Sequence, residues 1–347
     1  MRALVVRAPG PPSALRLEDV AAPEPGRRQV RVAVAACGVC FHDVVTRNGV
    51  FRFGVEMPVI PGHEVAGVIE KVGADVADIH VGDRVATTTH SHVCGHCRAC
   101  RSGHETSCPE GAFLGDSGLN GGYAEFVVVD ADAVVPLPEG IALEEGAIAA
   151  CAIGTELNAI RDVGRVQIGE RVLVTGAGGG IGLHGVQIAH QMAAFVIAVT
   201  TSPEKATAIR EAGADEVIVA GKGQDFSVAA RRLSGGRGVD AVIDNVGSPV
   251  FSSVRKSVVE GGRIVLVGQI NGDFVPMNPA QLFLRNTSLL SAKGVSRSQL
   301  VDVLDLVARR KVKPVVSETF ALEDGAKAHA LLESGRSWGR VILRPEA

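Results

Sequence analysis

Four cysteines lie close together in the sequence at a spacing that can enclose a metal ion. They are Cys94, Cys97, Cys100 and Cys108, and we call the segment that carries them the four-cysteine lobe. Zn²⁺ in structural sites takes four tetrahedral ligands, and two thiolates separated by two residues can bind one ion without strain. The spacing therefore predicts a structural zinc site.

The same cysteines could instead form disulfides or hold an iron–sulfur cluster. Disulfides are rare in the cytosol, and we see neither a secretory signal after Met1 nor an apolar run long enough to span a membrane, which predicts a cytoplasmic protein. In the ferredoxin pattern three residues precede the last cysteine, whereas seven separate Cys100 from Cys108. Zinc is favoured, but a structural ion stabilises the fold and names no reaction.

A second set of possible metal ligands is spread along the chain. Cys40, His63 and Cys151 offer two thiolates and one imidazole, and Glu64 follows His63. A catalytic zinc ion needs three protein ligands and an open position, from which it can act as a Lewis acid on an oxygen. Taken singly, however, a cysteine is more often a small buried apolar residue, and a histidine a hydrogen-bonded polar one. Spacing alone leaves both interpretations open.

A glycine-rich turn follows the apolar run 171–175 and precedes a helical pattern. Its residues are Gly176, Gly178, Gly179, Gly180, Ile181 and Gly182. Glycine lets the backbone approach a pyrophosphate, and a helix N-terminus supplies free N–H groups and the positive end of a dipole. A tight turn without a ligand is the alternative, but the flanking strand and helix are the context that the motif requires. We therefore predict dinucleotide binding.

The end of the next apolar run indicates which dinucleotide binds. An acid at this place would hold the ribose 2′-hydroxyl of NAD, but the sequence has Thr200, followed by Thr201, Ser202 and Lys205. Small hydroxyls and a lysine suit a 2′-phosphate, although no arginine is present and Glu204 lies close by. The sequence predicts a preference for NADP(H) over NAD(H).

Two kinds of local pattern must position these residues. The first part of the chain has short apolar or alternating runs between Gly, Pro and Asp, which predict β-structure, and the later part alternates apolar runs with helical patterns, which predicts a doubly wound parallel sheet. Strands are predicted at 3–6, 29–35, 65–72, 83–87, 123–129, 133–137, 171–175, 195–199, 216–219, 241–243, 263–267, 315–320 and 340–343. Helices are predicted at 181–192, 203–212, 226–233, 249–258, 299–309 and 323–332.

Composition limits the class of partner. A length of 347 residues favours two domains, and 46% hydrophobic with 21% charged residues is a globular balance. A net charge of −3 without a basic block argues against binding of nucleic acid or of a membrane surface. A small-molecule substrate is the expected partner.

Several motifs resemble the zinc-containing medium-chain alcohol dehydrogenase family over nearly the whole chain. They are Gly38-Val-Cys40-x-x-Asp43, Pro61-Gly62-His63-Glu64, Gly82-Asp83-Arg84-Val85, Gly121-Gly122-Tyr123-Ala124-Glu125, the four-cysteine lobe and the glycine-rich turn. The resemblance implies an α/β fold with a GroES-like β-barrel catalytic domain at 1–152 and 295–347, and a Rossmann doubly wound parallel sheet at 153–294. It also implies an active site in the cleft between the domains, and a homodimer or homotetramer joined through the Rossmann sheet.

The resemblance assigns roles to the candidate residues. Cys40, His63 and Cys151 are implied as ligands of a catalytic zinc ion, with Glu64 as an acid implicated in ligand exchange and Asp43 as the partner that orients His63. Two thiolates and one imidazole are the known ligand set in alcohol dehydrogenases, so this set is recognised and not worked out from spacing. With the ion of the four-cysteine lobe, two Zn²⁺ ions per chain are expected.

Other residues are assigned to the cofactor or to packing. Arg340 matches a position that often reaches the cofactor pyrophosphate, and Val246 and Gly268 are expected at the cofactor site. Cys37 matches no ligand position and is expected to pack in the core. The substrate pocket is expected to be lined by Phe41, His42, Phe51, Phe53, Phe113 and Leu114.

The implied reaction is reversible hydride transfer between NADP(H) and an alcohol or carbonyl carbon whose oxygen is bound to zinc. The family usually has Ser or Thr at the place of His42, and often a histidine at the place of Val45, to carry the alcohol proton outward. Imidazole transfers protons at neutral pH, so His42 either carries the proton itself or only contacts the cofactor and fills the site. The residues leave both roles open.

A different branch of the same superfamily is the alternative. The stretches 174–187, 199–205 and 310–314 are similar to acryloyl-CoA reductases, which use NADPH to reduce a carbon–carbon double bond. No alcohol proton then needs a relay, which would explain His42. The complete pair of zinc sites favours alcohol or carbonyl chemistry, and intact Cys40, His63, Glu64 and Cys151 argue against a non-enzymatic redox sensor or structural protein.

Overall fold

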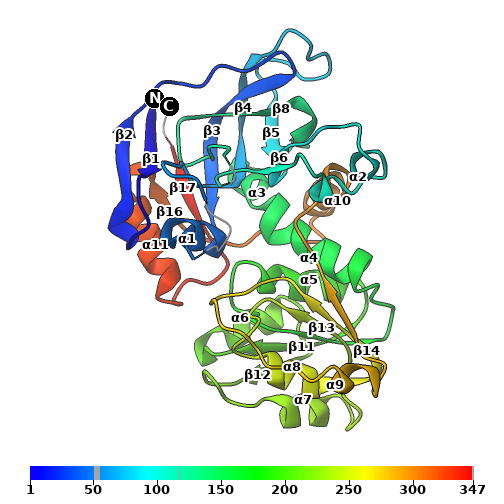
Figure 1. Cartoon of the computed structure of the whole chain (residues 1–347). Coiled ribbons are helices and arrows are strands. Elements are labelled where there is room, and N and C mark those ends of the chain that lie inside the picture. The colour runs from blue at the N-terminus through cyan, green and yellow to red at the C-terminus, as the bar shows by residue number, and fades with distance from the viewer. Residues whose placement is uncertain (51–54, 117, 346–347) are drawn as a thin grey trace. The chain divides into compact units, whose positions relative to one another are not determined.

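The computed structural model describes residues 1–50, 55–116 and 118–345, and contacts among Cα atoms divide the chain into two compact units. Unit 1 comprises Met1–Gly154, Gly294–Arg310 and Pro314–Ala347, and unit 2 comprises Thr155–Lys293 and Lys311–Lys313. Figure 1 shows the elements of each unit. The predicted domain boundaries, after residues 152 and 294, stay a prediction. Phe51 and Phe53, predicted to line the substrate pocket, lie outside the described residues.

Unit 1 is built mainly from antiparallel strands. Its strands are β1 (Arg2–Val6), β2 (Leu15–Asp19), β3 (Gln29–Val39), β4 (Glu64–Val72), β5 (Arg84–Thr87), β6 (His90–His92), β7 (Ala112–Phe113), β8 (Phe126–Asp130), β9 (Val134–Pro136), β16 (Val316–Ala321) and β17 (Arg340–Arg344). Its helices include α1 (Phe41–Asn48), α2 (Arg98–Arg101), α3 (Leu143–Ala147), the π-helix η4 (Ala149–Gly154), α10 (Arg297–Ala308) and α11 (Gly325–Glu333). The main sheet has the order β16-β17-β3-β4-β5-β9, and β8 also pairs with β3.

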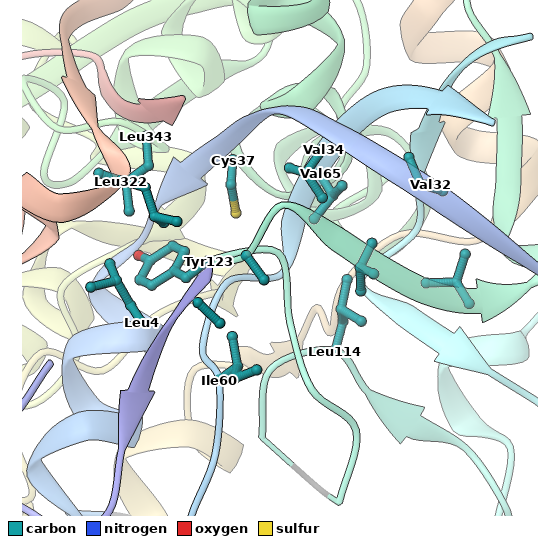
Figure 2. Packing of buried hydrophobic residues seen from close by; sticks show 14 of the residues in the cluster. Leu4, Val32, Val34, Cys37, Ile60, Val65, Leu114, Tyr123, Leu322 and Leu343 are labelled. Atoms are coloured by element: carbon teal, nitrogen blue, oxygen red, sulfur yellow. The ribbon is translucent and has the colours of Figure 1, made fainter. Parts of the chain in front are cut away.

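The long strand β3 organises unit 1 because three strands pair with it. Val30, Val32 and Val34 are buried, while the residues between them are only partly buried, as expected for a strand with one face on a core. Figure 2 shows this core, in which Tyr123 packs beside Leu4 and Cys37. Burying one such aliphatic side chain contributes about 1.5–3 kcal/mol, so packing around β3 holds the sheet together.

One predicted strand of unit 1 begins later than expected. The sequence predicted extended structure from Tyr123, but β8 begins at Phe126. Tyr123 lies in a bend, where its carbonyl accepts a hydrogen bond from the N–H of Leu4 at 2.8 Å. Its side chain therefore points into the core and does not continue the alternation of β8.

Unit 2 is a doubly wound parallel sheet, as predicted. Its strands are β10 (Arg171–Val174), β11 (Phe195–Thr200), β12 (Glu216–Val219), β13 (Val239–Asp244), β14 (Val258–Leu266) and β15 (Ser288–Ser291). Its helices include α4 (Thr155–Leu157), the π-helix η5 (Asn158–Val163), α5 (Gly182–Gln191), α6 (Ala206–Glu211), α7 (Ser227–Leu233), α8 (Phe251–Ser257) and α9 (Ala280–Phe283). The strand order β12-β11-β10-β13-β14-β15, with parallel pairs throughout, is that of dinucleotide-binding sheets.

Strand β15 was not predicted. It has only four residues, too few for the apolar run that predicts a buried strand. Most of them are exposed at the edge of the sheet. An edge strand can form from such a sequence because its partner β14 supplies the backbone hydrogen bonds. Among the helices of the described residues, none has the length and apolar character needed to cross a membrane.

Candidate metal and cofactor sites

The first candidate site lies where helix α1 begins. Asp43 stands in the first turn, and its Oδ2 accepts a hydrogen bond from the backbone N–H of Cys40 at 2.9 Å. This contact caps the helix and fixes the carboxylate. The other oxygen, Oδ1, accepts from the N–H of Gly62 at 3.2 Å and lies 2.9 Å from Nδ1 of His63. Asp43 therefore both starts the helix and orients the imidazole of His63.

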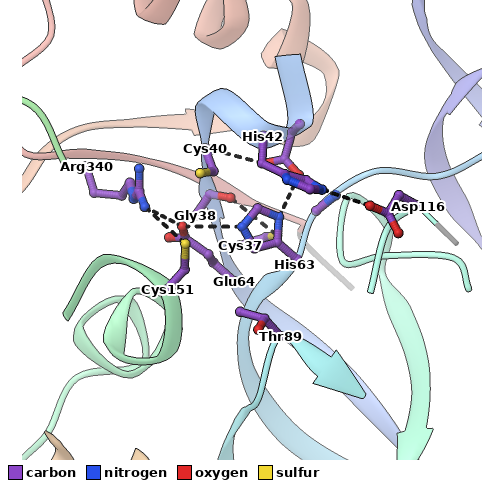
Figure 3. A network of polar contacts seen from close by, with 12 residues as sticks. Cys37, Gly38, Cys40, His42, His63, Glu64, Thr89, Asp116, Cys151 and Arg340 are labelled. Carbon is purple, nitrogen blue, oxygen red and sulfur yellow. Dashed lines mark hydrogen bonds and ion pairs between the residues drawn. The ribbon is translucent and has the colours of Figure 1, made fainter. Parts of the chain in front are cut away.

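The residues predicted to hold a catalytic metal ion come together in unit 1. One ligand atom from each of Cys40, His63, Glu64 and Cys151 lies within 4.8 Å of all the others, and all four residues are buried. Cys40 precedes α1, His63 precedes β4, Glu64 is the first residue of β4, and Cys151 lies in η4. Figure 3 shows the four side chains facing one another. Two sulfurs, one imidazole nitrogen and one carboxylate suit Zn²⁺, so the donor set fits that ion.

Arg340 of β17 reaches the same cluster. Its Nη2 lies 2.6 Å from Oε1 of Glu64 and 3.6 Å from Sγ of Cys151 (Figure 3). The contact with Glu64 is an ion pair, and neither oxygen of Glu64 has a hydrogen-bond partner among the described residues. A buried carboxylate is paired with a cation or coordinates a metal ion, and Arg340 supplies the cation here. The predicted contact of Arg340 with a cofactor pyrophosphate stays a prediction.

The charges in this cluster depend on one another. Burial raises the pKa of Glu64 to about 7, although the guanidinium of Arg340 opposes the rise. A hydrogen bond from Cys151 holds the pKa of the Cys40 thiol well below its usual range, with help from the positive charge of Arg340. The carboxylate of Glu64 and the thiol sulfurs keep Arg340 charged, raising its pKa despite burial. The cluster thus favours a thiolate at Cys40, which is the form that binds metal.

His42 lies at the edge of the cluster, one residue after the start of α1. Its Nε2 is 2.8 Å from Oδ2 of Asp116, and its ring centroid is 5.1 Å from that of His63 (Figure 3). The ring of Phe113 packs 4.5 Å from His42 and 4.9 Å from His63. Asp116 was not identified from the sequence, because no motif links it to His42. The contact places His42 with a carboxylate partner next to the metal-ligand cluster.

The four-cysteine lobe forms a second cluster of ligand atoms. The sulfurs of Cys94, Cys97, Cys100 and Cys108 lie within 4.8 Å of one another. Backbone N–H groups donate to three of these sulfurs at 3.3–3.4 Å. The N–H groups of His96 and Cys97 lower the pKa of the Cys94 thiol to about 6. Such donors stabilise thiolates around a metal ion. A separate group within the described residues, Cys94 with the exposed His96 and Glu110, shares one of these ligands.

The glycine-rich turn lies in unit 2 between β10 and α5. Gly176 has φ +62°, a left-handed conformation that favours glycine. At Gly182 a Cβ atom would lie 2.4 Å from the carbonyl oxygen of Gly176, so only glycine permits this approach of helix to turn. Val246 and Gly268 follow β13 and β14 at the same carboxyl edge, where dinucleotides bind in such sheets. The structure thus brings the predicted cofactor residues of unit 2 to one edge.

The residues after β11 lie against this turn. Lys205 covers Gly178, where an added Cβ would lie 2.7 Å from Cδ of Lys205 and 3.3 Å from Oγ1 of Thr200. Thr200 accepts a hydrogen bond from the N–H of Ser202 at 3.1 Å. Partial burial lowers the pKa of Lys205. Thr201 is exposed beside them. The side chains of Thr200 and Lys205 therefore both lie beside the glycine turn.

Comparisons with known proteins agree with this fold. The family profile described as alcohol dehydrogenase GroES-like domain matches residues 26–139, and that described as zinc-binding dehydrogenase matches residues 212–343. The acryloyl-coenzyme A reductase of Sulfurisphaera tokodaii is 34% identical over 346 residues, which cover 99% of this chain and 100% of that protein.

Two solved structures resemble the whole chain. The crystal structure of AibC has a TM-score of 0.92 and 40% identity, and covers 100% of this chain with 96% of its own. The structure of an NAD-dependent alcohol dehydrogenase has a TM-score of 0.93 and 35% identity, with 100% of both chains covered. The predicted combination of a GroES-like domain with a Rossmann sheet is confirmed. The chain therefore belongs to the zinc-containing medium-chain alcohol dehydrogenases, within the medium-chain dehydrogenase/reductase superfamily.

Proposed function

We propose that this protein is a zinc-dependent oxidoreductase that transfers hydride reversibly between NADP(H) and an alcohol or carbonyl substrate. The observation that carries the proposal is the buried cluster of Cys40, His63, Glu64 and Cys151, whose ligand atoms lie within 4.8 Å of one another. A Zn²⁺ ion bound there would supply a Lewis acid for the substrate oxygen, and a bound nicotinamide would supply or accept the hydride. Three of these residues would hold the ion, and Glu64 would exchange with substrate as a ligand.

The chain's own residues prepare the cluster for that chemistry. Asp43 accepts a hydrogen bond from Nδ1 of His63, so Nε2 is the nitrogen left to bind a metal ion. Arg340 balances the charge of Glu64 and contacts Cys151. The rings of Phe113 and His42 pack over one side of His63 and reduce its exposure to water. These contacts support a preorganised site in unit 1.

His42 is the residue best placed to move a proton. Its Nε2 lies 2.8 Å from Asp116, and its side chain is 29% exposed, so it can exchange protons with solvent. A carboxylate beside an imidazole fixes the orientation of the ring. We propose that His42 takes the role which a Ser or Thr has in most family members.

Reduction of an activated carbon–carbon double bond is the second candidate function. The whole-length similarity to an acryloyl-coenzyme A reductase favours it. The presence of His42 in place of a hydroxyl fits it as well, because a proton relay from an alcohol is then not needed. Both candidates use the same hydride donor, so substrate identity separates them.

A preference for NADP(H) is also proposed. Thr200 and Lys205 beside the glycine turn support it, because an ammonium and hydroxyls can bind a 2′-phosphate. A relative of 35% identity is named NAD-dependent, so the choice must be measured on this chain.

We further propose a cytoplasmic homodimer or homotetramer. The free thiols of all seven cysteines fit a reducing compartment. Edge strand β15, with Leu289 partly exposed, and the exposed Phe283 and Leu284 support association through the sheet of unit 2. Light scattering of the purified protein would give the number of chains.

One substrate panel tests the main proposal. NADPH and NADH oxidation would be followed with aldehydes and ketones, and with enones and enoyl-CoA thioesters. Carbonyl turnover supports the main proposal, and turnover of enoyl thioesters alone supports the second.

Cys40→Ser should abolish turnover and remove one of two zinc ions per chain. The matched control is Cys37→Ala, because Cys37 is buried nearby on β3 but contributes no ligand atom to the cluster. Full turnover by Cys40→Ser would disprove the zinc mechanism.

A further inference from the structure

A continuous series of buried hydrogen bonds leads from the metal-ligand cluster through the interior of unit 1. Asp43, which orients His63, is also 3.2 Å from the hydroxyl of Tyr123 through its Oδ2. That hydroxyl is 3.1 Å from Nε2 of His329, and Nδ1 of His329 is 3.1 Å from Nη1 of Arg47. All five side chains are at most 1% exposed, so water does not compete for these contacts.

Two helices and one bend bring these groups together. Asp43 and Arg47 lie one turn apart on α1, and His329 and Glu333 lie one turn apart on α11. Tyr123 stands between them, in the bend before β8, with its ring in the core of unit 1 (Figure 2). Arg47 ends the series by donating to Oε1 of Glu333 at 2.7 Å, where the Glu333 side chain is 30% exposed. The series therefore runs from the ligand cluster to the surface.

The chemistry of the end groups allows only one direction of donation. Arginine has donors and no acceptor, so Nδ1 of His329 must accept from Arg47. His329 then carries its proton on Nε2 and donates to the Tyr123 oxygen, and the Tyr123 hydroxyl donates to Asp43. Asp43 can only accept, so His63 donates from Nδ1, and Nε2 is the nitrogen left to bind a metal ion.

The electrostatics agree with this direction. Burial lowers the pKa of His329 to about 4, so its ring is neutral at pH 7. Burial and the charge of Asp43 raise the pKa of Tyr123 well above its usual range, so its hydroxyl keeps the proton it donates. The carboxylate of Glu333 forms a salt bridge with Arg47 and so compensates its buried positive charge.

We propose that Tyr123, His329 and Arg47 are positioning residues, which hold Asp43 and His63 in the orientation that a metal ion at the cluster requires. The inference rests on the proposed function, because it takes His63 as a metal ligand. None of the three residues touches the cluster's ligand atoms. They act through Asp43. Their hydrogen bonds keep the Asp43 carboxylate from rotating, and Asp43 in turn holds His63 in one tautomer.

Metal release measures this effect directly. In the full-length zinc protein, Tyr123→Phe removes only the hydroxyl, and His329→Leu removes both ring nitrogens. We expect each variant to release the ion of the Cys40–His63–Cys151 cluster to a chromogenic chelator about tenfold faster, the lower end of outer-shell effects on metal binding. His329→Gln keeps an N–H that can donate to Tyr123 and should retain most of the wild-type behaviour. The ion of the four-cysteine lobe serves as the control within each chain and should be released at the wild-type rate.

Magnetic resonance supplies a readout that a merely structural role would not change. Tyr123 is the only tyrosine of the chain, so tyrosine labelled at Cζ gives one signal, which should shift in His329→Leu. In ¹⁵N-histidine spectra, the signal lost in His329→Gln should be that of a neutral ring protonated at Nε2. A ring protonated at Nδ1, or at both nitrogens, at pH 7 would overturn the proposal.

The outcomes of metal release separate the two proposals. If Cys40→Ser lowers the zinc content while Tyr123→Phe and His329→Leu release metal at the wild-type rate, the positioning role is wrong and the proposed function stands. If Cys40→Ser leaves the zinc content unchanged, no ion depends on this cluster, and both proposals fall.

Discussion

Arg340 and Glu64 form an ion pair across strand β3, in a place closed to water. Their side chains are 4% and 0% exposed, and their nearest atoms are 2.6 Å apart. Arg340 lies on β17 and Glu64 on β4, the two neighbours of β3 in the sheet. Gly38 of β3 stands opposite Glu64, and a Cβ atom there would lie 2.1 Å from Oε2 of Glu64. A glycine at this position lets the two charges meet.

Replacement of Arg340 should show how much the buried carboxylate of Glu64 destabilises the fold when it has no partner. We expect Arg340→Met to lower the free energy of unfolding by about 3–5 kcal/mol at pH 8, because a buried charge is left without its partner. The loss should be smaller at pH 5, since the pKa of Glu64 is about 7 and protonation then removes the charge. Urea unfolding of metal-free protein measures both values.

The matched double variant tests the cause of that loss. Glu64→Gln combined with Arg340→Met removes both charges and should recover most of the stability at pH 8. Equal stability of Arg340→Met and wild type at pH 8 would show that the pair does not stabilise the fold.

A second buried acid should make unit 2 sensitive to pH. Glu156 of α4 is fully buried, and neither carboxylate oxygen has a hydrogen-bond partner among the described residues. Its carboxylate fills the space beside Gly185, where a Cβ would lie 2.6 Å from Cδ of Glu156. Burial raises the pKa of Glu156 to about 8. The folded protein thus holds this proton to a higher pH than the unfolded chain does.

The sign of the resulting pH dependence follows from linkage. The stabilising contribution is complete below the unfolded pKa, near 4.5, and is lost as pH rises to about 8, at up to ~1.4 kcal/mol per pH unit. Glu156→Gln should flatten this decline in thermal unfolding between pH 5 and pH 8.5. Glu211→Gln, at an exposed position, should leave the decline as it is in wild type. A decline that persists unchanged in Glu156→Gln would refute this assignment.

The four-cysteine lobe should contribute to stability more than to chemistry. Cys97→Ser removes one of its four sulfurs, and we expect it to cost one zinc ion per chain and at least ~2 kcal/mol, which corresponds to roughly 4–8 °C in melting temperature. Turnover per folded molecule should persist at moderate temperature. Ser102→Ala, in the same lobe, should keep both ions. If turnover disappears in Cys97→Ser while the protein remains folded, the lobe takes part in catalysis.

Lys205 should decide the choice of cofactor. Lys205→Ala is expected to weaken NADPH binding about tenfold, because it removes a charge-assisted contact to the 2′-phosphate, and to change NADH binding little. Fluorescence titration with each cofactor gives the two dissociation constants, and the exposed Lys222→Ala serves as the control. Tighter binding of NADH than of NADPH by the wild type would contradict the NADP preference.

Local patterns were enough to predict most of the elements that are buried. The predicted bounds of β12 are those of the structure, and α5 differs from its prediction by one residue at each end. Both are runs rich in apolar residues, which the local sequence displays. Strands β2 and β15 were missed because they are short and largely exposed, so that pairing with a neighbour, and not their own composition, makes them strands.

The candidate site was predicted only in part, for a related reason. Family motifs identified Cys40, His63 and Cys151, but no local pattern links Tyr123 with His329, which lies 206 residues further on. The partner of His42, Asp116, was missed for the same reason. Arg340 was expected at the cofactor, and its contact with Glu64 depends on the pairing of β17 with β3, which a linear sequence does not display.

The pairing of β17 with β3 also sets an order of events during biosynthesis. Val39 is the last residue of β3 and directly precedes Cys40. Val341 of β17 pairs with Val39 in the sheet. A nascent chain that has not yet been translated through Arg340 holds Glu64 without its cation, and lacks the helix that supplies His329 until residue 333 has emerged. The metal-ligand cluster therefore reaches its full charge balance only after Arg340 has been synthesised, 189 residues beyond Cys151, the last of its ligand residues.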